Sequence, residues 1–234
     1  MKLFDKLFFG FKTTGFEEVM LPDRNTSQSV LSTSVINNLS FGISEESRSP
    51  YDGLIVKLRS LPYNKYIHEL RKHVYKTPEA FTSRPYSTYA YITGKIKRGL
   101  IPSLDKYLLL LDVDSVKNCE KTIKWLNSRK IKHIVINSSP SHFWIIGDKI
   151  DTVENHTHLM EEIPGIDEKY TRCSRKQGVL LLRGFPKAGF IPKFNNSDRY
   201  SGKGLFEKWI IQFKSYWESE DLSEVANALF AEAL

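Results

Sequence analysis

One short stretch limits the folds and the chemistry that this chain can support, because an apolar run leads directly into two carboxylates. Tyr107 is followed by four leucines and then by Asp112, Val113 and Asp114. A run of this length and character is typical of a buried strand, and residues two apart in a strand point to the same face. We therefore expect the Asp112 and Asp114 side chains to lie side by side at one strand end.

This acid pair is a candidate metal site. Two carboxylates held so close repel one another unless a divalent cation lies between them. Mg²⁺ and Mn²⁺ prefer carboxylate oxygens and complete their coordination with phosphate oxygens and water. The pair therefore predicts phosphoryl transfer with Mg²⁺ or Mn²⁺ as cofactor. The alternative is a strand that ends in an acidic turn, although one Asp would be enough for that.

The composition is that of an ordinary globular protein, with 41% hydrophobic and 26% charged residues among 234. No apolar stretch approaches the roughly 18 residues that span a bilayer, so we expect no membrane partner. The first ten residues lack the pattern of a secretory signal. The two cysteines, Cys119 and Cys173, are expected to be free thiols in a cytoplasmic or otherwise intracellular setting.

Positive charge is concentrated in residues 57–106. This stretch holds eleven Lys or Arg residues and three acids, so its net charge of +8 exceeds the +7 of the whole chain. Seven aromatic residues are interleaved with the cations, which suits a phosphate backbone with stackable bases. We therefore expect it to bind single-stranded DNA, with Lys95, Lys97 and Arg98 as candidate contacts. For any single tyrosine, a place in the core is the alternative.

The chain alternates between helical and strand patterns, which favours an α+β fold. We expect helices at residues 62–76, 116–130, 151–162, 204–218 and 221–232, and strands at residues 84–94, 107–112, 131–136, 142–146 and 178–183. The catalytic acids are expected at adjacent strand ends. The organisation that we predict is an N-terminal arm or decoration (1–50), a core (51–200) and C-terminal helices (201–234).

Three short motifs resemble those of the archaeo-eukaryotic primase superfamily, in the same order. They are Asp112-Val-Asp114, the serine-containing turn that runs into His142, and Ile166-Asp167, followed by a strand and Arg183-Gly-Phe-Pro-Lys187. The resemblance covers about residues 84–194. It implies that residues 51–200 form a primase-polymerase catalytic core, with a central mixed or antiparallel sheet in an RRM-like arrangement flanked by helices.

The resemblance also implies roles for individual residues. Two divalent metal ions would be held by Asp112, Asp114 and Asp167. The triphosphate of an incoming nucleotide would be held by Ser139, Ser141 and His142, with its charge neutralised by Arg183 and Lys187. Phosphoryl transfer needs such a site because it depends on positioning and on cationic stabilisation of developing charge.

Two of these assignments have alternatives in the residues themselves. His142 is also compatible with a strand residue bonded to backbone, and Asp167 with a helix cap after Pro164-Gly165. The chain departs from the family as well, because the turn before His142 carries no cation and two cysteines cannot supply a zinc-binding insertion. No Walker A sequence is present, so unwinding would require a separate helicase as partner.

The leading interpretation is a metal-dependent DNA primase or DNA-directed polymerase. It would make or extend primers from nucleoside triphosphates on a single-stranded DNA template. A non-catalytic nucleic-acid-binding accessory protein of replication is one alternative. A haloacid-dehalogenase-type phosphatase is another, since its first motif is also an apolar strand ending in Asp-x-Asp. That fold needs a later acid pair after a lysine, which this sequence does not offer.

Overall fold

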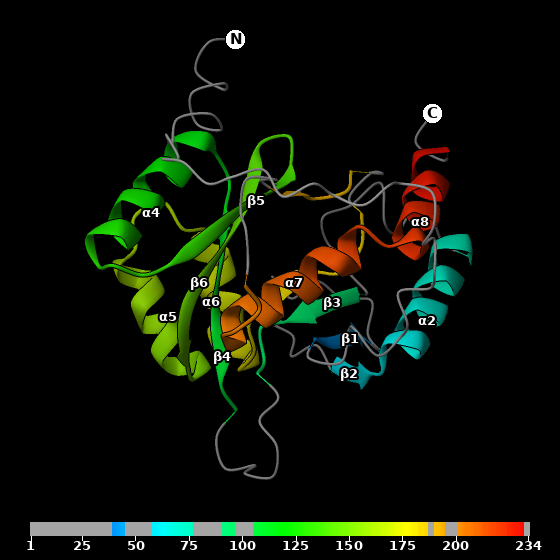
Figure 1. Cartoon of the computed structure of the whole chain (residues 1–234), viewed down its shortest axis with the longest axis horizontal. Helices are drawn as coiled ribbons and strands as arrows, with labels where there is room; N and C mark the ends of the chain where they lie inside the picture. Colours follow the sequence, from blue (N-terminus) through cyan, green and yellow to red (C-terminus); the bar gives the residue numbers. More distant parts are fainter. Residues whose placement is uncertain are drawn as a thin grey trace. The chain divides into compact units, whose positions relative to one another are not determined.

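The structure is a computed structural model that describes residues 39–44, 58–76, 90–96, 105–186, 190–194 and 201–231, all within the compact unit Thr33–Leu234 (Figure 1). In these residues, eight strands form two four-stranded antiparallel sheets, and six helices accompany them. The α+β class is confirmed. The expectation of one central sheet was wrong, because the strands pair in two separate sets.

The first sheet has the order β2-β1-β3-β7. Its strands are β1 (Ser40–Ser44), β2 (Leu58–Leu61), β3 (Ala90–Thr93) and β7 (Leu181–Arg183). β1 lies inside the N-terminal arm expected for residues 1–50, yet it pairs with both β2 and β3. The boundary drawn at residue 50 therefore separates paired strands of one sheet.

The second sheet has the order β4-β6-β5-β8. Its strands are β4 (Tyr107–Val113), β5 (His133–Ser139), β6 (His142–Asp151) and β8 (Lys193–Phe194). The four leucines of β4 have no exposed surface, so the run that the sequence marks as apolar lies in the core. Backbone bonds join the end of β3 to the start of β4, since Leu108 donates to the Gly94 carbonyl at 2.9 Å.

Of the six helices in the described residues, five correspond to the helices expected from the sequence, and one is additional. They are α2 (Tyr63–Lys76), α4 (Val116–Ser128), α5 (Val153–Glu162), α6 (Glu168–Gln177), α7 (Leu205–Trp217) and α8 (Glu220–Ala231). α6 was not expected, because residues 168–177 contain few apolar side chains. No helix in the described part of the chain is long and apolar enough to cross a membrane.

The last two helices pack into the core. The ring of Trp144 on β6 lies 5.8 Å from that of Trp217 and 6.1 Å from that of Phe213, both on α7. The hydroxyls of Tyr66 on α2 and Tyr216 on α7 both donate to the Gly184 carbonyl, the first at 2.6 Å. These contacts tie α7 to both sheets.

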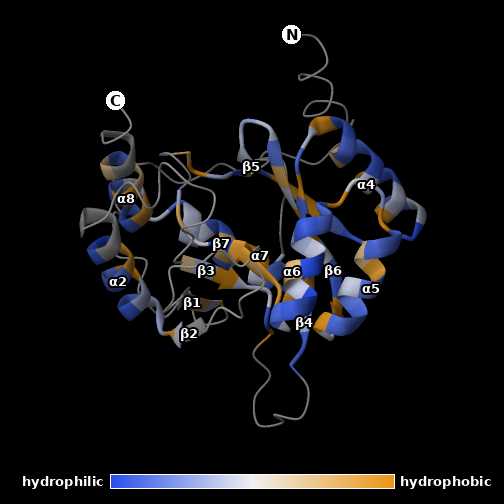
Figure 2. Ribbon diagram, turned by 180° about the vertical axis from the view of Figure 1, so that it is seen from behind, coloured by the Kyte–Doolittle hydropathy of each residue, from blue (hydrophilic) through white to orange (hydrophobic). Residues whose placement is uncertain are grey.

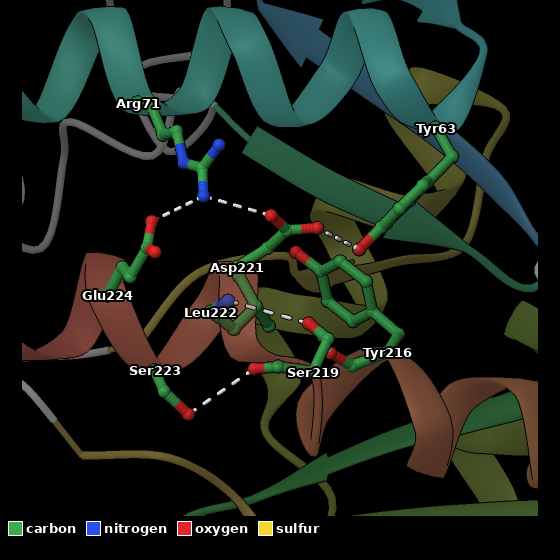
Figure 3. Close-up of polar contacts among 8 residues, drawn as sticks. All are labelled: Tyr63, Arg71, Tyr216, Ser219, Asp221, Leu222, Ser223 and Glu224. Atoms are coloured by element: carbon green, nitrogen blue, oxygen red, sulfur yellow. Dashed lines mark hydrogen bonds and ion pairs between the residues drawn. The ribbon is translucent and has the colours of Figure 1, made fainter. Parts of the chain in front are cut away.

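Polar side chains join α8 to α2 (Figure 3). Arg71 donates to Asp221 at 2.9 Å and also pairs with Glu224. The hydroxyl of Tyr63 donates to the other carboxylate oxygen of Asp221 at 2.9 Å. Asp221 thus accepts hydrogen bonds from two residues of α2, and these bonds hold α8 against α2.

Candidate metal centre

Three carboxylates meet beyond the end of β4. Asp112 is near the end of the strand, Asp114 follows it, and Asp167 lies at the start of α6. One ligand oxygen from each lies within 4.8 Å of the others. Asp114 is exposed and the other two are partly buried, so the cluster has access to solvent.

Asp167 is held in place by the loop before α6. The hydroxyl of Thr122 on α4 donates to the Pro164 carbonyl at 2.8 Å. Gly165 has a φ of 91°, and a Cβ there would lie 2.7 Å from the backbone oxygen of Asn118, so only glycine fits. The loop is thereby fixed against the start of α4.

A backbone bond then sets the position of Asp167 itself. Its N–H donates to the Asp112 carbonyl at 3.1 Å, which places its carboxylate beside the β4 end. The expectation that all the acids lie at adjacent strand ends was wrong, because Asp167 begins a helix. It caps α6 by accepting from the Lys169 N–H at 2.8 Å. A carboxylate has two oxygens, so capping leaves one for a cation.

The donor set fits Mg²⁺ or Mn²⁺. All three ligands are carboxylates, which hard divalent cations prefer, and there is no thiol or imidazole among them. Oxygens bound to one Mg²⁺ at about 2.1 Å lie at most about 4.2 Å apart. Since the three oxygens lie within 4.8 Å of one another, at most a small contraction of the cluster would be needed to surround an ion.

His142 lies at the rim of the cluster. Its Nε2 is 3.6 Å from Oδ1 of Asp114. Its Nδ1 is 2.9 Å from the Ser139 hydroxyl and 3.1 Å from that of Ser141. An Nδ1 that accepts from serine leaves the proton on Nε2, the nitrogen facing Asp114. The structure thus brings His142, with Ser139 and Ser141 at its other ring nitrogen, to the pair of Asp112 and Asp114.

Arg183 is partly buried and bridges the two sheets. Its Nε donates to the Phe185 carbonyl at 3.0 Å, and its Nη2 donates to the Ser138 carbonyl at 2.9 Å. Its guanidinium carbon lies 5.4 Å from the ring centroid of Trp144. Burial lowers its pKa to about 10, and the charge of Asp112 opposes that shift, so Arg183 is a cation at neutral pH.

Sequence reasoning missed Tyr170, which lies on α6 one turn after Asp167. Its hydroxyl is buried beside Ser174 of the same helix. Burial and the nearby charge of Asp112 raise its pKa well above the usual range. The signal that could have found it is its i+3 spacing from a capping Asp, which puts both residues on one side of a helix.

Of the three expected nucleic-acid contacts, Lys95 lies in the described part of the chain, and it is not at this centre. Lys95 pairs with Asp105 at 2.6 Å and lies beside Tyr107, at the opposite end of β4 from Asp112. Five residues of strand correspond to about 16 Å. Lys97, Arg98 and Lys187 lie outside the described residues.

In the basic stretch of residues 57–106, side chains are described for five of the cations, and four of these five are engaged in ion pairs. Among its cations with described side chains, Arg71, Lys72 and Lys106 form ion pairs within 4.0 Å, as Lys95 does. Tyr66 and Tyr91 are buried in the core. For these two tyrosines the core alternative is the correct one.

Comparison with known proteins adds no relative. No protein-family model matches the chain, and neither a search of curated proteins nor one of solved structures returns a match.

Proposed function

We propose that this protein is a metal-dependent nucleotidyltransferase of the primase-polymerase kind. It uses Mg²⁺ or Mn²⁺ to add nucleotides from nucleoside triphosphates to a strand paired with single-stranded DNA. The observation that carries the proposal is the convergence of Asp112, Asp114 and Asp167, with His142 at 3.6 Å from one of them. These residues come from a strand end, a helix start and a hairpin.

In this proposal, each side chain has one task. The three carboxylates hold the cations, which neutralise the charge that develops on the phosphates during transfer. His142 donates from Nε2 to a phosphate oxygen, and the serine hydroxyls at Nδ1 keep the ring in that orientation. Charge-assisted bonds of this kind contribute about 1.5–3 kcal/mol.

Arg183 receives a different task from the triphosphate contact that the motif suggested. Two of its N–H groups already donate hydrogen bonds to the backbone carbonyls of Phe185 and Ser138. We therefore assign it to balancing the charge of Asp112 and to fixing β7 against β5. Lys187 is given no task, because it lies outside the described residues.

A nucleotide titration tests the proposal. Wild-type protein is titrated with a nucleoside triphosphate in the presence of Mn²⁺, and again with EDTA. We expect saturable binding that requires Mn²⁺ and that weakens about tenfold or more in His142→Ala. The matched control is His158→Ala, since His158 is an exposed histidine that pairs with Glu161 at 3.6 Å on α5. This control should bind as wild type does.

The same titration separates the enzyme from an accessory protein. An accessory protein has no triphosphate site, so it would show no saturable binding with Mn²⁺ at any nucleotide concentration, whatever its affinity for DNA. That result would end the proposal. Equal weakening in the two histidine variants would remove His142 from the site.

A further inference from the structure

α6 presents a basic face to solvent. Lys169, Arg172 and Lys176 follow the i, i+3, i+7 spacing that places side chains on one side of a helix, and all three are exposed. Thr171 and Ser174, on the other side, are buried. Figure 2, which views the chain from behind, shows α6 as a mostly hydrophilic ribbon.

None of these three cations forms an ion pair or a side-chain hydrogen bond within the described part of the chain. Arg175 differs, since it points elsewhere and pairs with Glu161 at 2.6 Å. Cations that need not break an ion pair are better placed to bind an external anion than the engaged ones of residues 57–106.

The thiol of Cys173 lies among these charges. Burial raises its pKa, while the charges of Arg172 and Lys176 act in the opposite direction. Arg172 and Lys176 therefore both lie near the Cys173 side chain, as residues on one face of the helix should.

The face also begins at the metal centre. Lys169 is two residues from Asp167 and donates its N–H to that carboxylate at 2.8 Å. From residue 169 to residue 176 the helix rises about 10 Å. One strand of a nucleic acid carries a phosphate about every 3.4 Å in a duplex, so this length corresponds to about three phosphates.

We propose that Lys169, Arg172 and Lys176 bind the phosphate backbone of the nucleic-acid strand on which the metal centre acts. Three cations in a row, with no partner among the described residues, match the negative charge of that backbone. Because the row begins two residues after Asp167, a strand bound along it would reach the metal centre, where the phosphates react. The choice of ligand rests on the proposed function. It adds α6 to the contact surface that the sequence predicts at residues 57–106.

Salt-dependent binding tests this surface. The triple variant Lys169→Gln, Arg172→Gln, Lys176→Gln is compared with a control that removes three exposed, unpaired cations elsewhere: Lys124→Gln, Lys130→Gln, Lys208→Gln. Affinity for oligothymidylate is measured in EDTA at several NaCl concentrations. Each lost contact lowers the slope of log K against log salt by about 0.7, so the α6 variant should lose about 2. The control should keep the wild-type slope.

An unchanged slope in the α6 variant, or an equal loss in the control, would overturn the inference. Thermal unfolding of both variants checks that each is folded. Because EDTA removes the metal, this result is independent of nucleotide binding. The proposed function falls if Mn²⁺-dependent nucleotide binding is absent, whereas the α6 surface falls if the slope does not change.

A second readout uses the two cysteines. Cys173 is partly exposed on the basic face, and Cys119 is buried on α4. Oligothymidylate should slow the alkylation of Cys173 in the native protein. Cys119 reports opening of the fold, since it reacts only when its surroundings unfold. Equal labelling of Cys173 with and without saturating DNA would contradict the proposal.

Discussion

Neutralising Asp114 should stabilise the protein in the absence of metal. Its carboxylate oxygen lies within 4.8 Å of an oxygen of Asp112 and of Asp167. Two charges at this distance repel by about 1 kcal/mol in water. The side chain of Asp114 is 54% exposed, so the water value is the appropriate one. Asp114→Asn removes two such repulsions and loses the attraction of His142, for a net gain of about 1 kcal/mol.

The assay is thermal unfolding, in EDTA and with Mn²⁺. For a chain of this size, 1 kcal/mol corresponds to about 2–4 °C in Tm, so the variant should melt higher than wild type in EDTA by that amount. A metal at ten times its Kd stabilises the folded state by about 1.4 kcal/mol. Wild type should therefore gain a similar increment with Mn²⁺, and Asp114→Asn should lose most of it.

Asp148→Asn is the matched control, since Asp148 is an exposed acid on β6 outside the cluster. It should melt as wild type does under both conditions. A lower Tm for Asp114→Asn in EDTA would refute the repulsion argument. A full Mn²⁺ shift in that variant would refute the metal assignment.

Three other substitutions test the fold. His156 is buried and donates from Nε2 to the Tyr107 carbonyl, and burial lowers its pKa, so the unfolded chain binds a proton that the folded one does not. Stability should thus fall below about pH 6.5 by at most about 1.4 kcal/mol per pH unit, and His156→Gln should flatten the plot of Tm against pH. An unchanged plot would contradict this. A Cβ at Gly184 would meet the Tyr66 hydroxyl, so Gly184→Ala should cost about 1–3 kcal/mol in urea unfolding, and a neutral result would contradict the packing. Arg183→Met keeps the packing but loses two hydrogen bonds to backbone, so it should cost about 2–4 kcal/mol, whereas unchanged stability would show that those bonds do not join the sheets.

The parts of the fold that sequence could predict are those where burial dictates the pattern. The run from Tyr107 to Asp112 must be buried, and β4 forms there. α7 follows an apolar period with Trp209, Phe213 and Trp217 on one side. By contrast, β1 pairs with strands about 20 and 50 residues away, and local pattern does not specify such partners.

α6 shows why a helix could be missed. Its buried residues include Thr171 and Ser174, so the apolar period that marks most helices is absent. Its end signals were present, with Asp167 as N-cap and Gly178 in the left-handed conformation after the last turn. These two end signals predict α6 even without an apolar period between them.

The candidate site was only partly predictable from the chain alone. The strand pattern brings Asp112 and Asp114 together, but nothing local requires Asp167 to join them 53 residues later. That contact depends on the loop fixed at Gly165 and on a backbone bond to Asp112. The resemblance to primases suggested the third acid. The position of Arg183 between the sheets follows from tertiary packing, which neither the motif nor its spacing encodes.

The proposed polymerase activity is measured most directly as incorporation of labelled nucleotides on single-stranded DNA, with and without a primer. Ribo- and deoxynucleotides are offered separately, with Mg²⁺ or Mn²⁺. Wild-type protein should form products that vanish in EDTA and in Asp112→Ala, while Asp148→Ala should remain active. Absence of product with every nucleotide and metal, from protein that is folded, would contradict the account, as would full activity in Asp112→Ala.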